Sequence, residues 1–150
     1  MVASLGTRAS RRTRREAVRA ALRLQNHEIE RVLQRAEVRE TGPNEVVVAE
    51  GDVADHLFVI VRGKFVVSVV DGNDRRLPVR MLAAGQCFGE MGLLDGGRRR
   101  ATVTCGTDDG ELLVLTAADL RYLLDGAAEA RRGLVDAAAE RAGQLARLAI

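Results

Sequence analysis

The chain has 150 residues with a net charge of +2, of which 47% are hydrophobic and 29% charged; this balance suits one soluble domain with its own core. No apolar run approaches the ~20 residues that a membrane-spanning helix needs. The Arg-rich N-terminus lacks the apolar segment of a secretory signal. We therefore expect a cytoplasmic protein.

The charge is unevenly distributed. Residues 8–23 carry seven arginines and one acid, Glu16, a net +6 that leaves −4 for the rest of the chain. We assign residues 1–22 to a basic N-terminal arm, partly disordered or helical, and residues 23–150 to one domain. Three interpretations of the arm stay open: a solvated tail, a contact for an anionic surface such as a membrane or nucleic acid, or the join to an upstream domain.

Apolar spacing predicts the elements in chain order. Three- and four-residue steps predict a helix over residues 14–36, with Asn26 capping its second half and residues 1–13 as a tail. A second helix follows Thr116, with Asp119 completing a capping arrangement, and another spans residues 127–148. Between the helices, short strands separated by glycine turns are predicted at residues 45–49, 57–61, 65–70, 77–82, 101–104 and 112–115.

This order predicts a mainly β fold with flanking helices. We expect an antiparallel β-roll of the double-stranded β-helix or jelly-roll kind, with an N-terminal helix and two C-terminal helices. The two cysteines, Cys87 and Cys105, match no zinc or disulfide spacing, and His27 and His56 lie far apart. We therefore expect no metal site. No nucleophile–base pair or acid–base dyad is visible, and we expect no enzyme.

The most informative segment is residues 88–103, FGEMGLLDGGRRRATV. Gly89 and Gly92 allow backbone to approach a ligand on both sides of Glu90. The turn that follows presents free N–H groups to an anion. A carboxylate beside such a site suits sugar hydroxyls, and the arginines at 98–100 offer a fork for phosphate oxygens. The segment therefore combines groups that bind a sugar with groups that bind a phosphate.

This pattern resembles the phosphate-binding cassette of the cyclic-nucleotide-binding domain family, which includes protein kinase A regulatory subunits, cyclic-nucleotide-gated channels and catabolite activator proteins. Residues 88–94 match the first half of the family pattern, and Arg99 with the Ala-Thr-Val tail at 101–103 matches the second. Residues 50–63 resemble the family's early strands and turns, and residues 117–148 its closing helices. The resemblance covers residues 24–148.

The resemblance implies a role for each matched residue. Glu90 would accept a hydrogen bond from the ribose 2′-hydroxyl, and Arg99 would bind the cyclic phosphate. Backbone amides near Gly89, Gly92 and Ala101 would complete the anion site, with Leu82 and Val103 as its apolar wall. The full set of candidate ligand-binding residues is Leu82, Phe88, Gly89, Glu90, Met91, Gly92, Leu93, Arg99, Arg100, Ala101, Thr102 and Val103.

Two choices remain open within the site. Some bacterial members have a cassette longer by one residue, and in that register Arg100 would bind the phosphate; the Ala-Thr-Val tail favours Arg99. Members that prefer cGMP often carry Thr or Ser after the phosphate arginine. Arg100 holds that position here, which favours cAMP over cGMP, although Thr102 still offers a hydroxyl. The last helix would cap the base, with Arg141, Gln144 and Leu145 as candidates.

We interpret the chain as a cyclic-nucleotide sensing module whose C-terminal helix repositions when cAMP or cGMP binds. No other cofactor is expected. The expected partners are the nucleotide and an unidentified effector, with homodimerisation through the C-terminal helix as one route. No helix-turn-helix follows the roll before Ile150, so sequence-specific DNA binding is not expected. The alternative is a degenerate roll that serves as a scaffold without ligand, its cassette filled by Arg98 or Arg100.

Overall fold

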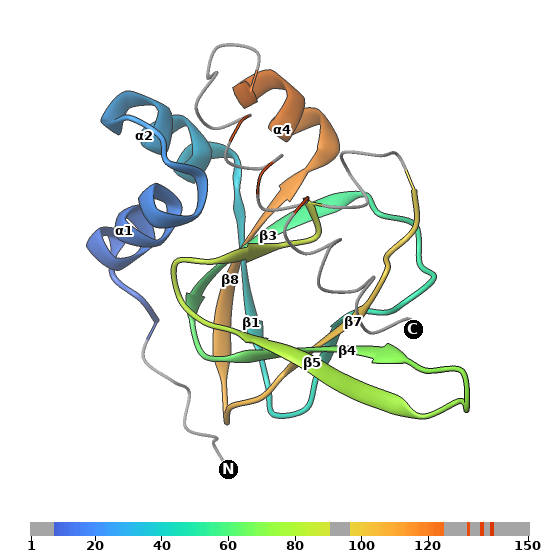
Figure 1. Cartoon of the computed structure of the whole chain (residues 1–150). Helices are drawn as coiled ribbons and strands as arrows, with labels where there is room; N and C mark the ends of the chain where they lie inside the picture. Colours follow the sequence, from blue (N-terminus) through green and yellow to red (C-terminus); the bar gives the residue numbers. More distant parts are fainter. Residues whose placement is uncertain (1–7, 91–96, 125–131, 133–135, 137–138, 140–150) are drawn as a thin grey trace.

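The computed structural model describes residues 8–90 and 97–124, together with the single residues 132, 136 and 139. In this part of the chain, two helices precede a β-roll and one follows its last strand (Figure 1). The helices are α1 (Arg11–Leu22), α2 (Asn26–Arg35) and α4 (Ala117–Leu124). The strands are β1 (Glu37–Thr41), β2 (Val46–Val48), β3 (His56–Arg62), β4 (Phe65–Val70), β5 (Arg76–Leu82), β6 (Cys87–Phe88), β7 (Thr102–Cys105) and β8 (Gly110–Thr116).

The strands of the described residues form two four-stranded antiparallel sheets. One has the order β1-β8-β3-β6 and the other β2-β7-β4-β5. Sequence neighbours such as β2 and β3 lie in different sheets, so the chain passes between the sheets as it does in a roll. The predicted class, an antiparallel β-roll with flanking helices, is confirmed. No helix among the described residues is long and apolar enough to cross a membrane.

Strand β3 separates two cores. Its five central residues, Leu57 to Val61, are all buried, because successive side chains point to opposite faces of a strand and both faces are covered. Leu57, Val59 and Val61 pack against residues of α1, α2 and α4. Phe58 and Ile60 point into the roll and pack against residues of the second sheet such as Phe65 and Leu82. The second core lies beneath the cassette.

The long helix predicted over residues 14–36 is wrong in its limits and its continuity. Helix α1 begins at Arg11, because the Ser10 side chain accepts the Thr13 N–H at 3.1 Å. It ends at Leu22, because the next residue, Arg23, has a left-handed φ of 55° and caps the helix. Helix α2 is capped by a reciprocal pair of Gln25 and Glu28, not by Asn26 as predicted. The disordered tail predicted over residues 1–13 is wrong for residues 11–13, which belong to α1, and its first seven residues lie outside the described residues.

The predicted strands match β2, β3, β4, β5, β7 and β8 within two residues at each end. Strands β1 and β6 were not predicted. Strand β1 has the sequence EVRET, whose side chains are mostly exposed, so apolar alternation is missing. It forms because its backbone pairs with β8 over five residues, from Glu37↔Val114 to Thr41↔Gly110. The predicted cap of the last described helix is confirmed, since Asp119 N–H donates to Thr116 Oγ1 at 3.1 Å.

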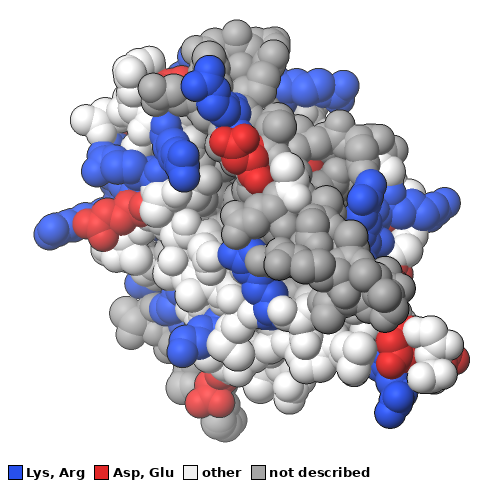
Figure 2. All heavy atoms as spheres, in the orientation of Figure 1, with Lys and Arg blue, Asp and Glu red and all other residues white. Residues whose placement is uncertain are grey.

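The basic arm is docked on the body through ion pairs. Basic side chains over α1 and α2 stand beside acidic ones on the face that Figure 2 shows. Most of the pairs are exposed, and exposed pairs contribute little to stability. The pairs with the body are Arg8 with Glu40, Arg11 and Arg15 with Glu30, and Arg14 with Glu111, whereas the pair of Arg12 with Glu16 lies within α1.

The Arg14–Glu111 pair differs because Glu111 is fully buried. On β8 it shares the face of Leu113 and Leu115, which is covered by helices. Arg14 Nε donates to it at 2.8 Å and the Ala9 N–H at 3.1 Å. Burial acts to raise the pKa of Glu111, but these hydrogen bonds and the charges of Arg14 and Arg62 outweigh it, so the pKa lies below its usual value.

Arg14→Met should lower the free energy of unfolding by about 2–4 kcal/mol at pH 7, because it leaves the Glu111 carboxylate buried without its cation. The lowered pKa makes ionised Glu111 stabilising above its reference value of 4.5, and this contribution is lost as the pH falls through the native pKa. Urea unfolding between pH 7 and pH 3 measures both effects.

Arg12→Met is the matched control, because its pair with Glu16 is exposed at both ends; it should change stability by less than about 0.5 kcal/mol. The difference between wild type and Arg14→Met should shrink toward pH 3. Equal stability of the two variants at pH 7, or a difference that grows with acid, would show that the pair does not hold α1.

Candidate functional site

The second half of the cassette is positioned by backbone pairing with the segment after β2. Arg99 N–H donates to the Asp52 carbonyl at 2.7 Å, and Gly51 N–H donates to the Arg99 carbonyl at 2.8 Å. Val53 and Arg98 form a β-bridge, and Ala54 N–H donates to Gly97. This pairing fixes which side chains point inward, because neighbours in an extended segment alternate in direction.

Arg99 is the arginine of the triplet that points inward. Its exposed fraction is 6%, whereas Arg98 and Arg100 are exposed. Nη1 donates to the Gly89 carbonyl at 2.9 Å, and Nη2 donates to the His56 carbonyl at 2.8 Å. Arg98 instead donates to the Gly51 carbonyl. The arginine of the favoured register is therefore buried and held at two atoms.

Glu90 lies next to the Gly89 contact and is fully buried. Its charge acts on Arg99, together with those of Asp55 and Asp52. Burial lowers the pKa of the Arg99 guanidinium, and the three carboxylates only partly oppose this. Within the described residues, the shortest ion-pair distance for Arg99 is 4.0 Å, from Nη2 to Asp55 Oδ1. Arg99 is thus a buried cation whose direct hydrogen bonds go to carbonyls.

Gly89 is required by the close approach of Arg99. Its φ is +95°, which side-chain-bearing residues rarely adopt. A Cβ at this position would lie 2.6 Å from Arg99 Nη1 and 2.7 Å from the His56 carbonyl oxygen. A glycine here was predicted for backbone approach to a ligand. The structure shows that it also makes room for the arginine.

The remaining predicted site residues fall into three groups. Leu82, Phe88 and Val103 are buried in the core of the roll. Thr102 is also buried, and its hydroxyl accepts the Glu50 N–H at 3.0 Å, while Ala101 is half-buried. Three cassette residues, Met91, Gly92 and Leu93, lie outside the described residues, as do the base-capping candidates Arg141, Gln144 and Leu145.

Two groups near Arg99 were not predicted as part of the site. His56 supplies the carbonyl that accepts from Arg99, and its ring Nδ1 lies 2.7 Å from Asp55 Oδ1. Phe58 lies under the guanidinium, with its ring centroid 5.8 Å from Arg99 Cζ. No sequence signal points to them, because strand β3 reaches the cassette only through the fold.

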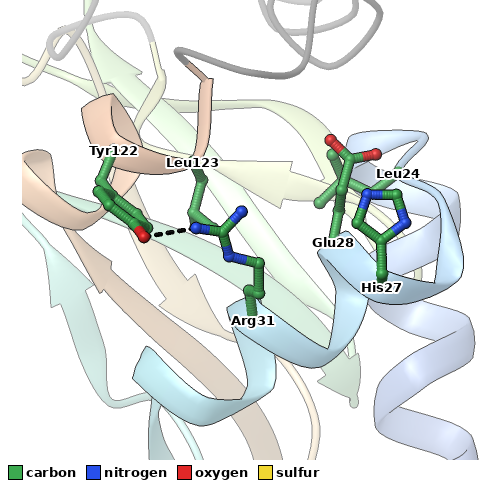
Figure 3. A pocket seen from close by; sticks show the side chains of 6 residues that line it. All are labelled: Leu24, His27, Glu28, Arg31, Tyr122 and Leu123. Atoms are coloured by element: carbon green, nitrogen blue, oxygen red, sulfur yellow. Dashed lines mark hydrogen bonds between the residues drawn. The ribbon is translucent and has the colours of Figure 1, made fainter.

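A small pocket lies between α2 and α4 and is lined by residues outside the 88–103 segment (Figure 3). Arg31 donates a hydrogen bond to the Tyr122 hydroxyl, and the Arg31 and Arg35 guanidinium carbons lie 4.9 and 4.2 Å from the Tyr122 ring centroid. Arg35 also pairs with Asp119 at 3.2 Å. These contacts join α4 to α2. The pocket is lined by Leu24, His27, Glu28, Arg31, Tyr122 and Leu123.

The architecture is that of a β-roll with flanking helices and a buried arginine and glutamate on one loop. A family model described as the cyclic nucleotide-binding domain matches residues 38–126. The match spans more than half of the chain, so the chain belongs to the cyclic nucleotide-binding domain family. The predicted family is confirmed. The matched range lies inside residues 23–150, whose limits as a domain stay a prediction.

Named relatives include a cyclic nucleotide-gated potassium channel of Rhizobium etli, 38% identical over 98 residues, which are 65% of this chain and 26% of the channel. A cAMP-dependent protein kinase regulatory subunit of Mycosarcoma maydis is 33% identical over 88 residues, covering 57% of this chain and 17% of the subunit. The chain thus spans only about a quarter of the channel's length and about a sixth of the subunit's length. By name, the first is a gated channel and the second is a regulatory subunit.

Solved structures share the fold. The catabolite activator protein of Thermus thermophilus superposes with a TM-score of 0.73 at 25% identity, over 81% of this chain and 57% of that protein. The regulatory domain of Toxoplasma gondii protein kinase A, solved with cAMP, superposes with a TM-score of 0.75 at 18% identity, over 87% of this chain and 50% of that domain. The second likeness, at this identity, shows the fold alone.

Proposed function

We propose that this chain is a non-catalytic, cytoplasmic sensing module that binds cAMP in preference to cGMP. The observation that carries the proposal is the state of Arg99: a buried guanidinium, held by two carbonyls, with a fully buried Glu90 close enough for their charges to interact. Burying a cation is costly unless an anion balances it. A cyclic phosphate bound at Arg99 would supply that anion.

Arg99 retains donors for the phosphate. A guanidinium has five N–H groups, and within the described residues two of them are used by the Gly89 and His56 carbonyls. These two bonds orient the guanidinium before a ligand arrives, which lowers the entropy lost on binding. Glu90 would accept a hydrogen bond from the ribose 2′-hydroxyl, a neutral group that needs only an acceptor. Backbone N–H groups of the cassette would complete the phosphate contacts.

The preference for cAMP rests on the residue after Arg99 and on Thr102. Arg100 stands where cGMP-preferring relatives carry Thr or Ser, and its side chain is exposed. The Thr102 hydroxyl accepts from the Glu50 backbone. This hydrogen bond ties the Thr102 hydroxyl to the segment that follows β2. The hydroxyl is therefore less suited to select guanine.

The proposal includes a movement of the C-terminal helix on binding. Of the helix predicted over residues 127–148, the structure describes only residues 132, 136 and 139, so the contacts that bear on this movement are those of α4. Asp55, whose carboxylate lies 4.0 Å from Arg99, also accepts a hydrogen bond through its carbonyl from the Ala117 N–H at the start of α4, at 3.1 Å. Helix α4 is joined to α2 through Tyr122 (Figure 3). A phosphate that competes with Asp55 for Arg99 would therefore act on the segment that begins α4. A ligand shifts α4 only if it binds the two positions with different affinity.

Isothermal titration with cAMP and with cGMP, together with thermal unfolding, tests this function. We expect tighter binding of cAMP and a melting temperature that rises with its concentration, since a ligand present at 100 times Kd stabilises the native state by about 2.7 kcal/mol. The same titration has a second readout, because the chain has one tyrosine. Incorporated 3-fluorotyrosine should give one ¹⁹F signal, from Tyr122, that shifts with saturation.

Arg99→Ala is the control for the ¹⁹F signal: at the same cAMP concentration it should leave the Tyr122 resonance unmoved. Absence of heat and an unchanged melting temperature in millimolar cAMP and cGMP would instead support a scaffold without ligand. If cAMP binds without any shift of the Tyr122 resonance, cAMP binding is supported and the helix movement is contradicted.

A further inference from the structure

The three phenylalanines of the chain lie in one column beneath the site. The rings of Phe58 and Phe88 stack with centroids 4.9 Å apart at an interplanar angle of 14°, and Phe65 meets Phe88 with centroids 6.0 Å apart at 38°. They come from β3, β6 and β4, and all three are buried. The column ends at Arg99, whose Cζ lies 5.8 Å from the Phe58 centroid.

The place of Phe58 in the column is set by two strand pairings. It is opposite Phe88 on β6 and opposite Val114 on β8, so its backbone is held from both sides. Its ring is 4% exposed, and Phe88 packs against it. A ring held in this way has little freedom to move. It therefore offers a fixed surface to the planar guanidinium.

The carbonyl bonds alone do not fix Arg99 completely. They hold Nη1 and Nη2 at one edge of the guanidinium, and rotation about the line joining these contacts tilts its plane. An aromatic ring beside a cation opposes that tilt through its quadrupole and its van der Waals surface. Phe58 is the aromatic ring beside Arg99, with its centroid 5.8 Å from Cζ. The tilt of the guanidinium plane decides where the remaining N–H groups point.

We propose that Phe58 is a positioning residue for Arg99: its ring fixes the plane of the guanidinium so that the free N–H groups face the anion. The expected effect of Phe58 on nucleotide affinity rests on the proposed function. The positioning role also makes a prediction about the ligand-free protein that does not depend on that function. Phe58 touches no ligand in this role and acts only through Arg99.

The affinity test is a double-mutant cycle read by cAMP titration. Phe58→Leu should weaken cAMP binding about fivefold, a size at the lower end of the range for cation–π contacts that suits a centroid distance near the 6 Å limit, and Phe58→Tyr should restore it because the ring is retained. In the Arg99→Ala background Phe58→Leu should have no further effect on affinity. Phe65→Leu is the matched control: Phe65 is equally buried, belongs to the same core and reaches Phe88 but not Arg99.

Melting temperatures of the variants distinguish a role of Phe58 in positioning Arg99 from a role in packing the core. Phe58→Leu and Phe65→Leu should lower the melting temperature by similar amounts, while only Phe58→Leu weakens binding. An equal loss of affinity in the two variants, or a loss that persists in the Arg99→Ala background, would overturn the proposal by showing that Phe58 acts through the core as a whole.

The ligand-free test uses the Nε–Hε resonance of Arg99, assigned by its disappearance in Arg99→Lys. Phe58→Leu should shift this resonance and speed its exchange with water, because the ring that restrains the guanidinium is gone; Phe65→Leu should leave it near its wild-type position. If wild type binds neither cAMP nor cGMP but the resonance behaves in this way, the proposed function fails and the positioning role holds. An unmoved resonance in Phe58→Leu overturns the positioning role itself.

Discussion

Replacing Arg99 with alanine should weaken cAMP binding at least tenfold, whereas replacing Arg100 with alanine should change it less than about twofold. A charge-assisted hydrogen bond contributes about 1.5–3 kcal/mol, which corresponds to a factor of ten or more in Kd. Arg99 is buried with its guanidinium already oriented, so its bonds to a phosphate would be formed at little cost in entropy. Arg100 is exposed, where solvent screens its charge.

Isothermal titration of both variants measures the difference. Arg99→Lys refines the result, because lysine keeps the charge but lacks the fork that reaches the Gly89 and His56 carbonyls together; it should bind more weakly than wild type. The melting temperature of each ligand-free variant must be followed in parallel, since removing Arg99 leaves the Gly89 and His56 carbonyls without this donor. Weaker binding in Arg100→Ala with normal binding in Arg99→Ala would assign the phosphate to the longer register.

Replacing Gly89 with alanine should lower the free energy of unfolding by about 2–4 kcal/mol and also abolish measurable cAMP binding. The left-handed conformation costs a side-chain-bearing residue about 1–2 kcal/mol, and overpacking adds about 1–3 kcal/mol. The new Cβ would collide with Arg99 Nη1 at 2.6 Å and with the His56 carbonyl oxygen at 2.7 Å. The carbonyl belongs to β3 and cannot move easily, so Arg99 should be displaced.

Gly51→Ala is the control that separates the cost of backbone strain from the cost of a steric collision by the new Cβ. Gly51 has a similar φ of +93°, but nothing lies within 4 Å of the position of its Cβ. Gly51→Ala should therefore lower the free energy of unfolding only by the backbone strain, about 1–2 kcal/mol, and should leave cAMP binding unchanged. Denaturant unfolding gives the two stabilities, and titration at a temperature where both variants are folded gives the affinities. If Gly89→Ala binds cAMP as Gly51→Ala does, the close approach of Arg99 is not needed for the ligand.

Prediction from the sequence succeeded where the signal was local. Short apolar runs bounded by turn residues identified β3, β4 and β8, and the cap formed by Thr116 and Asp119 is a contact within three residues. It failed where a distant segment supplied the partner. Strand β1 lacks an apolar face and exists because β8 pairs with it. The break between α1 and α2 depends on the left-handed conformation of Arg23. Glycine is the usual signal for this conformation, and the sequence has arginine at this position.

The amino-acid order by itself determined the family, the roll and the loop that carries the glutamate and the arginines, because all three are expressed in short patterns of residue type. Which arginine of the triplet turns inward was decided by the tertiary structure. Pairing of residues 97–99 with the segment at 51–54 sets their alternation, and those two segments meet only when the roll is formed. The same holds for Phe58 and Glu111, whose partners reach them from other strands and helices.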